Sequence, residues 1–112
     1  VIHLHNIHNH YVNVKMLFDY IKAKDIPVVW TLHDCWSFTG HCAYFDYAQC
    51  DKWKKGCFKC PSLKDYPPTW FFDFSERNYV DKKRTFCGVK NLVLCTEVNS
   101  HLVLHDRLFR HL

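Results

Sequence analysis

The sequence has few glycines for its length, and their spacing excludes two common nucleotide-binding motifs. Only Gly40, Gly56 and Gly88 occur among the 112 residues. Glycines at these positions can form neither the G-x-G-x-x-G dinucleotide fingerprint nor the G-x-x-x-x-G-K-[ST] phosphate loop. Long apolar runs are also missing. Runs such as Val28–Leu32 and Trp70–Phe72 are far shorter than the roughly 20 residues that span a bilayer.

Concentrated positive charge is lacking too. The net charge is +4, and lysines and arginines cluster only at Lys52–Lys55 and Lys82–Arg84. A nucleic-acid-binding protein usually gathers its charge on one face, so we expect no nucleic-acid partner. Hydrophobic residues make up 48% of the chain, which is enough for a folded core. Cysteine and histidine are abundant, at seven and nine residues, and an odd number of cysteines cannot all form internal disulfides.

The first third of the chain predicts a strand, a helix and a second strand. Val1–His5 is typical of the end of a short strand. A helix is predicted between Asn13, a suitable N-cap, and Pro27, which prevents it from continuing. Its apolar residues recur at the i, i+3, i+4 and i+7 spacing of one helical face: Val14, Leu17, Phe18 and Ile21. Val28–Leu32 is apolar on both sides, which indicates a central parallel strand covered by helices on both faces.

The rest of the chain alternates between a long loop and regular elements. Residues 34–68 show no periodicity, and a loop of this length needs something to tie it together. A helix is predicted over 73–86, with Phe72, Tyr79 and Phe86 on one stripe, then a buried strand over 90–95. A last helix is predicted from Asn99 or Ser100, carrying Leu104, Leu108 and Leu112. The order favours an α/β fold, a partial Rossmann-like domain with about three parallel strands and flanking helices, interrupted by a Cys-rich insertion loop. Three strands are few for a closed core, so the sequence favours a piece of a larger α/β domain.

Four cysteines lie close together in the predicted loop. Cys42, Cys50, Cys57 and Cys60 fall within nineteen residues, and the last two form a C-x-x-C turn. Zinc prefers four thiolate or imidazole ligands, so this group predicts a structural zinc site, with His41 as a substitute ligand. Unligated or redox-labile thiols and disulfides are the alternatives. Cys95, at the end of an apolar strand, is expected to be a small core residue.

Histidines follow the predicted strands. His3 and His5 are two residues apart and share one face of their strand, while His33 and Asp34 directly follow the next strand. Ligands of open parallel sheets bind at the carboxyl ends of the strands, which makes these residues candidates for a site. An H-x-H pair also occurs in metal-dependent hydrolases. The aromatics around the loop predict either packing or a platform for sugar rings or a lipid chain: Trp30, Trp36, Phe38, Tyr44, Phe45, Tyr47 and Trp53.

One stretch resembles a known family. The segment W-T-L-H-D-C-W-S-F-T-G-H-C at 30–42 is similar to the amino-terminal domain of bacterial family 4 glycosyltransferases of capsule and exopolysaccharide gene clusters. The segment V-I-H-L-H-N-I-H at 1–8 resembles the same subgroup, as do Cys50, Lys52-Trp53-Lys54, Gly56-Cys57 and Cys60-Pro61. The resemblance extends over nearly all of the chain, and T-L-H-D-x-W-x-F-T-G with the following cysteines is its most specific part.

The resemblance implies a GT-B enzyme, in which two Rossmann-like domains face a cleft. Such enzymes transfer a hexose-like sugar from a nucleotide sugar to a glycan or lipid-linked acceptor with retention of configuration. The amino-terminal domain mostly recognises the acceptor, and the carboxy-terminal domain grips the nucleotide and carries an E-x7-E motif that this sequence lacks. We therefore expect an interior piece of the amino-terminal domain that is inactive alone. The resemblance also implies a location in the cytoplasm, including the inner face of the membrane.

The resemblance also assigns roles to individual residues. His33 matches the histidine beside the donor sugar and phosphate, and with Asp34 it is the predicted catalytic pair. His5, His8 and Trp36 are the predicted substrate-binding residues. The four cysteines match a subgroup feature interpreted as a structural metal site. Two other classes remain as alternatives: a zinc-stabilised binding module and a metal-dependent hydrolase.

Overall fold

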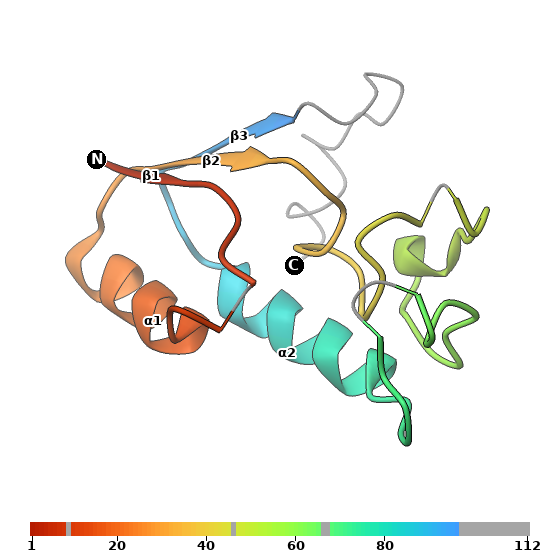
Figure 1. Ribbon diagram of the computed structural model, residues 1–112. Coiled ribbons are helices and arrows are strands. Elements are labelled where there is room, and N and C mark those ends of the chain that lie inside the picture. Colours follow the sequence, from red (N-terminus) through yellow and green to blue (C-terminus); the bar gives the residue numbers. More distant parts are fainter. Residues whose placement is uncertain (9, 46, 66–67, 97–112) are drawn as a thin grey trace. The chain divides into compact units, whose positions relative to one another are not determined.

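The computed structural model describes residues 1–8, 10–45, 47–65 and 68–96, so the predicted last helix lies outside the described residues (Figure 1). The chain divides into two compact units. We call Val1–His33 together with the chain from Thr85 onward the sheet unit, and Asp34–Arg84 the loop unit. The elements in chain order are β1 (Ile2–Leu4), α1 (Val14–Lys24), β2 (Val28–Leu32), the 3-10 helix η1 (Lys52–Lys54), α2 (Ser75–Phe86) and β3 (Leu92–Thr96).

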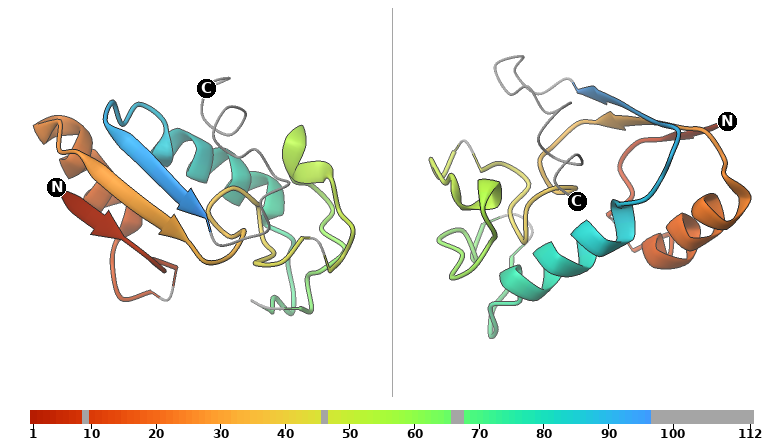
Figure 2. Two further views of the ribbon diagram at one scale, coloured as in Figure 1. Left: turned by 90° about the horizontal axis from the view of Figure 1, so that it is seen from above. Right: turned by 180° about the vertical axis from the view of Figure 1, so that it is seen from behind.

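The three strands form one parallel sheet in the order β1-β2-β3 (Figure 2). β2 is central, with Ile2 opposite Val28 on one side and Leu92 opposite Val28 on the other. Parallel neighbours need crossover connections, and a helix precedes each of the two later strands in the sequence. The predicted α/β class with three parallel strands is confirmed.

Helix α1 begins and ends where its sequence predicts. The side chain of Asn13 accepts a hydrogen bond from the backbone N–H of Met16, which satisfies one of the free donors of the first turn. At the other end Asp25 adopts the left-handed conformation, and its N–H and that of Ile26 bond to the last turn. Pro27 follows and starts the chain toward β2, so the helix is bounded on both sides by local chemistry.

An aromatic core fills the sheet unit between α1 and the sheet. Phe18 and Ile21 of α1 are completely buried, and Trp30 of β2 is 2% exposed. The ring of Phe18 lies 5.5 Å from that of Trp30 and 4.8 Å from that of Phe86, measured between centroids. Tilted and edge-on ring pairs of this kind contribute beyond their buried area. The predicted apolar face of α1 is therefore the face that packs against Trp30 and Phe86.

The other face of the sheet is open among the described residues. Along β2, Val28, Trp30 and Leu32 are buried, whereas Val29 and Thr31 are only partly buried. Val93 of β3 is 52% exposed and Cys95 is exposed as well. The predicted last helix lies outside the described residues, so coverage of both faces stays a prediction, whereas the prediction that Cys95 is a core residue is wrong. The exposure of Cys95 follows from alternation along the strand, which turns every second side chain away from α1.

The aromatic stripe predicted for α2 is wrong at Phe72. One carboxylate oxygen of Asp73 accepts a hydrogen bond from the backbone N–H of Ser75, and the helix begins there. Phe72 thus lies in the preceding loop with 69% of its surface exposed, while Phe86 is buried.

Every helix among the described residues is too short or too polar to span a bilayer.

The loop unit is built mainly of turns around a second aromatic cluster. Phe38, Phe45 and Trp53 are buried, and their ring centroids lie 5.1 to 6.0 Å apart. The hydroxyl of Tyr79 in α2 donates to the backbone carbonyl of Trp53. Three of the aromatics that the sequence offered as a platform are therefore core residues. Tyr44 and Tyr47 are exposed.

Candidate functional site

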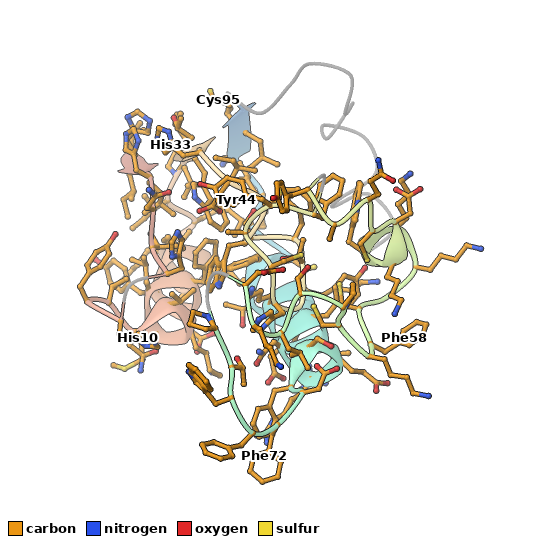
Figure 3. The ribbon with its side chains drawn as sticks, turned by 45° about the vertical axis from the view of Figure 1, so that its right-hand side comes forward. His10, His33, Tyr44, Phe58, Phe72 and Cys95 are labelled. Atoms are coloured by element: carbon orange, nitrogen blue, oxygen red, sulfur yellow. The ribbon has the colours of Figure 1, made fainter. Side chains whose placement is uncertain are left out.

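Three histidines of the sheet unit form a row of ring contacts: His3 lies within β1, and His5 and His33 directly follow β1 and β2. Nδ1 of His5 lies 2.8 Å from Nε2 of His33, and the two rings are stacked with 5.2 Å between centroids. The ring of His3 lies 4.3 Å from that of His5, and Nε2 of His3 is 2.9 Å from Oγ1 of Thr31. His33 is labelled in Figure 3. We call His3, His5 and His33 the histidine cluster.

The sheet explains why these side chains meet. Parallel pairing places Leu4 opposite Trp30, so the residues that follow β1 and β2 emerge at the same edge of the sheet. The indole N–H of Trp30 then donates to the backbone carbonyl of His5 at 3.0 Å. Because Trp30 is itself locked in the aromatic core, this bond fixes the backbone from which His5 projects.

The pair of His5 and His33 can hold a proton without losing its hydrogen bond. A bond between two ring nitrogens needs one N–H and one lone pair, which two neutral imidazoles or one imidazole and one imidazolium can supply. If both rings were protonated, two N–H groups would face each other and the hydrogen bond would be lost. The hydrogen bond is therefore compatible with one added proton on the pair, and a singly protonated pair would suit an anionic ligand such as a phosphate.

The predicted residues Asp34 and Trp36 lie in the loop unit and contact each other. The Asp34 carboxylate accepts a hydrogen bond from the backbone N–H of Trp36 at 2.9 Å, and Asp34 is 9% exposed. This bond closes a tight turn directly after β2 and is typical of an aspartate that shapes its own loop. His8, also predicted to bind substrate, is half-buried in the segment after β1.

Lys82 is a residue of this region that the sequence did not reveal. Its Nζ donates to the carbonyls of Trp36 at 2.7 Å and Thr39 at 3.0 Å, and lies 3.8 Å from the centroid of the Trp36 ring. Burial lowers the pKa of Lys82 to about 7, while the thiols of Cys57 and Cys42 and the Asp34 carboxylate oppose that shift. Lys82 thus holds the turn between Trp36 and Thr39, and its ammonium covers one face of that tryptophan.

A signal for Lys82 was present in the sequence. The residue stands in a run of basic side chains, which predicts a solvated surface. It also follows Tyr79 by three positions and precedes Phe86 by four, and both of those contact other parts of the protein. Helix neighbours at these spacings share a face, so Lys82 belongs to the inward side of α2.

The four predicted metal ligands influence one another's ionisation in the loop unit. Burial is the main cause that raises the pKa of Cys42, Cys57 and Cys60, and neighbouring thiols of the same group, including Cys50, raise these pKa values further. The backbone of Gly40 forms a hydrogen bond that favours the Cys57 thiolate, and that of Ser62 does the same for Cys60. None of the seven cysteines, all of which the structure describes, forms a disulfide.

The chemistry of this donor set fits zinc, since thiolates and imidazoles are its usual structural ligands. His41 adds a buried imidazole whose Nε2 has no hydrogen-bond partner and whose pKa is lowered chiefly by burial. In the described ranges, no group of three or more His, Cys, Asp or Glu side chains stands in position to hold a metal ion. The cysteines are neighbours without forming a ligand shell, and zinc stays a prediction.

The fold and the histidine cluster define an α/β chain with polar side chains at the carboxyl ends of its parallel strands, the place where such folds bind ligands. Over 73 residues the chain is 47% identical to the "Putative colanic acid biosynthesis glycosyl transferase WcaC" of Escherichia coli (strain K12). The match covers 61% of this chain and 18% of that relative, so the chain spans about a fifth of its length. No family model matches the chain. No solved structure matches it either.

Proposed function

We propose that this chain is part of a glycosyltransferase of exopolysaccharide biosynthesis. It would transfer a sugar from a nucleotide-sugar donor to a glycan or lipid-linked acceptor. The observation that carries the proposal is the 47% identity over 73 residues to a glycosyl transferase of colanic acid biosynthesis. The histidine cluster supports it, because it offers hydrogen-bonding imidazoles where parallel sheets bind ligands.

The finer proposal is a family 4 enzyme of the GT-B type, of which this chain forms part of the amino-terminal Rossmann-like domain. The parallel order β1-β2-β3 is compatible with such a domain. The loop unit would be a Cys-rich insertion after β2, and the nucleotide would be gripped by a carboxy-terminal domain of the same enzyme. This segment would then line the acceptor side of the cleft.

In the proposed reaction His33 acts on the leaving group. The bond between the anomeric carbon and the donor diphosphate breaks, a bond to an acceptor hydroxyl oxygen forms with the same configuration, and the proton of that hydroxyl passes to the departing diphosphate. An imidazolium at His33 stabilises the charge that develops on the diphosphate. His5 shares the proton and fixes the ring through its 2.8 Å hydrogen bond. His8 contributes to substrate binding from the segment after β1.

Asp34 and Trp36 complete the proposed set of site residues. The Asp34 carboxylate holds the backbone of the turn after β2, where the resemblance places the catalytic histidine and aspartate. Trp36 presents an aromatic face of the type that stacks on sugars, and Lys82 lies over its ring. Substrate recognition by Trp36 would therefore use the part of the ring that Lys82 leaves accessible.

The experiment that tests this function uses the full-length protein that contains the segment. The purified protein is offered a panel of nucleotide sugars, and the release of nucleoside diphosphate is measured with and without a glycan or lipid-linked acceptor extract. Acceptor-dependent release with one donor supports the proposal, and retention is read from the anomeric configuration of the product. The 112-residue segment alone should release none. If the protein instead hydrolyses a substrate other than a nucleotide sugar, and metal removal abolishes that hydrolysis, the metal-dependent hydrolase is favoured.

We also propose a structural zinc ion held by Cys42, Cys50, Cys57 and Cys60, with His41 as a substitute ligand. A bound zinc would neutralise the thiolates that otherwise raise one another's pKa. Metal analysis of the full-length protein should give one zinc per chain attributable to this group. Cys57→Ser should lose it and lower the unfolding temperature, whereas Cys95→Ser, at an exposed cysteine of the sheet unit, should not. Retention of zinc in Cys57→Ser, or its loss on substitution of His3 or His5, would contradict this proposal.

A further inference from the structure

The loop before α2 exposes four aromatic side chains within five residues. Trp70, Phe71, Phe72 and Phe74 have 83%, 89%, 69% and 49% of their surfaces exposed. We call Trp70–Phe74 the aromatic loop. Single exposed aromatics are common, but a contiguous group of this kind marks an interaction surface. Phe72 projects away from the ribbon at the outer end of this loop in Figure 3.

The aromatic loop is held in place at both ends. The N–H of Thr69 donates to the carbonyl of Leu63 at 2.7 Å just before the loop. Within it, Asp73 accepts hydrogen bonds from the backbone N–H groups of Cys60 at 2.8 Å and Ser75 at 2.9 Å. The rings of Phe72 and Phe74 contact each other with 5.9 Å between centroids. The scaffold therefore presents these side chains to solvent while fixing the backbone beneath them.

A basic segment is joined to this loop. Between positions 52 and 64 the chain has five lysines and no carboxylate, and the Cys60–Asp73 hydrogen bond ties the segment to the aromatic loop. Lys55, Lys59 and Lys64 are exposed. Lys52 bonds to carbonyls of the same segment, and Lys54 pairs with Asp51. The acidic neighbours Asp65 and Glu76 offset part of this charge, so the segment keeps an excess of positive charge.

We propose that the aromatic loop inserts into the interfacial region of an anionic lipid membrane while the basic segment contacts its headgroups. Tryptophan and other aromatics prefer the boundary between headgroups and acyl chains, and lysines near the surface are attracted to anionic lipids. This pairing of apolar and basic elements is the two-part signal that stable peripheral binding requires. The inference stands on the loop unit alone and goes beyond the proposed transfer reaction.

Trp70 supplies a built-in reporter for the test. Trp30 and Trp53 are buried and Trp36 is half-buried, so Trp70 is the tryptophan of this chain that a membrane would reach first. The full-length protein is mixed with vesicles of phosphatidylcholine, with or without phosphatidylglycerol. We expect a blue shift of emission and quenching by brominated lipid in the anionic vesicles. The difference spectrum against Trp70→Phe, which keeps an aromatic ring, assigns the signal to the loop.

Co-sedimentation with the same vesicles measures the binding. The double variant Trp70→Ser/Phe71→Ser should lose affinity for anionic vesicles by about tenfold or more, and Lys55→Glu/Lys64→Glu by a smaller factor that vanishes at high salt. Tyr47→Ser is the matched control, because Tyr47 is 92% exposed and lies outside the loop. Its binding should equal that of the wild type.

Equal binding by the wild type and the double variant would overturn the proposal. So would the absence of vesicle binding combined with a changed oligomeric state of the double variant, which would make the loop a protein interface. Neither readout depends on turnover of a nucleotide sugar. A protein that binds vesicles through the loop but transfers no sugar would refute the proposed function and leave this inference standing.

Discussion

The two units of the chain are stabilised by different means. In the sheet unit a ladder of parallel strands and the rings of Phe18, Trp30 and Phe86 form a continuous apolar core. The loop unit packs a smaller aromatic cluster among buried polar residues, including Thr39, His41 and Ser62. Local turn chemistry and side-chain bonds to backbone carbonyls replace the regular ladder there.

The two units also differ in how well their buried polar side chains are hydrogen-bonded. In the part of the chain that the structure describes, four buried side-chain atoms have no hydrogen-bond partner, and all belong to the loop unit: Ser37 Oγ, His41 Nε2, Trp53 Nε1 and Ser75 Oγ. Each unpartnered buried group costs about 1–3 kcal/mol. The loop unit therefore carries a cost of unpartnered buried groups that the described residues of the sheet unit do not show.

Substitution in the aromatic core should have the largest effect. Phe18→Ala removes a completely buried ring that contacts both Trp30 and Phe86. We expect it to lower the free energy of unfolding by about 3–5 kcal/mol. Denaturant unfolding of the full-length protein measures this. A loss below about 1 kcal/mol would mean that the sheet unit is not held by this core.

The second prediction concerns the close packing of the loop unit at Gly40. A Cβ at this position would lie 2.0 Å from the carbonyl oxygen of Ser75 and 2.6 Å from Cβ of Cys57. Because a backbone atom cannot move aside easily, Gly40→Ala should cost about 3 kcal/mol. Gly88→Ala is the contrast, since it adds no contact but strains a φ of 82°, and should cost about 1 kcal/mol. Equal losses in thermal unfolding would contradict the predicted packing.

The third prediction concerns pH and Lys82. Its folded pKa of about 7 lies below the ordinary value of 10.5, so the unfolded chain binds more protons between these values. The free energy of unfolding of the wild type, relative to Lys82→Met, should therefore rise from pH 7 to pH 10 by about 1 kcal/mol or more. Cys42, Cys57 and Asp34 face the ammonium and are present in both proteins, so the difference isolates Lys82. A flat difference would show that the ammonium is solvated.

The smallest effect is expected at the surface of the sheet unit. Lys90 and Asp25 form a 3.3 Å ion pair, but both side chains are more than half exposed. Screening by water and salt leaves such pairs with little net stability, so Lys90→Ala should change the free energy of unfolding by less than about 0.5 kcal/mol. A larger loss, measured under the same conditions as Phe18→Ala, would weaken the contrast between core and surface.

The periodic parts of the chain could be predicted from the sequence. Asn13, Pro27 and the apolar face at Phe18 and Ile21 defined α1 because capping and helical spacing act locally. The strand Val28–Leu32 was predicted with its observed bounds. The exposure of Val93 and Cys95 on β3 could not be predicted, because coverage of a sheet face depends on elements distant in sequence.

The candidate site could be predicted only in part. His5 and His33 were expected at one sheet edge, since parallel pairing brings strand ends together, but their 2.8 Å bond depends on the register. Lys82 was hidden within a basic run because its burial is set by the turn at Trp36 and Thr39. The roles of Asp34, His8 and the four cysteines stay predictions, as no local pattern decides what they bind.

The central claim is that His5 and His33 act as one unit on the donor phosphate, and a double-mutant cycle on turnover tests it most directly. The rate of nucleoside diphosphate release is measured for the full-length protein with His33→Ala, His5→Ala and both. His10→Asn, at an exposed histidine with positive φ, serves as the control, and unfolding temperatures show that the fold is kept. We predict that His33→Ala lowers the rate by about 100-fold and that adding His5→Ala lowers it little further. An unchanged rate in His33→Ala, or losses that multiply independently, would contradict the claim.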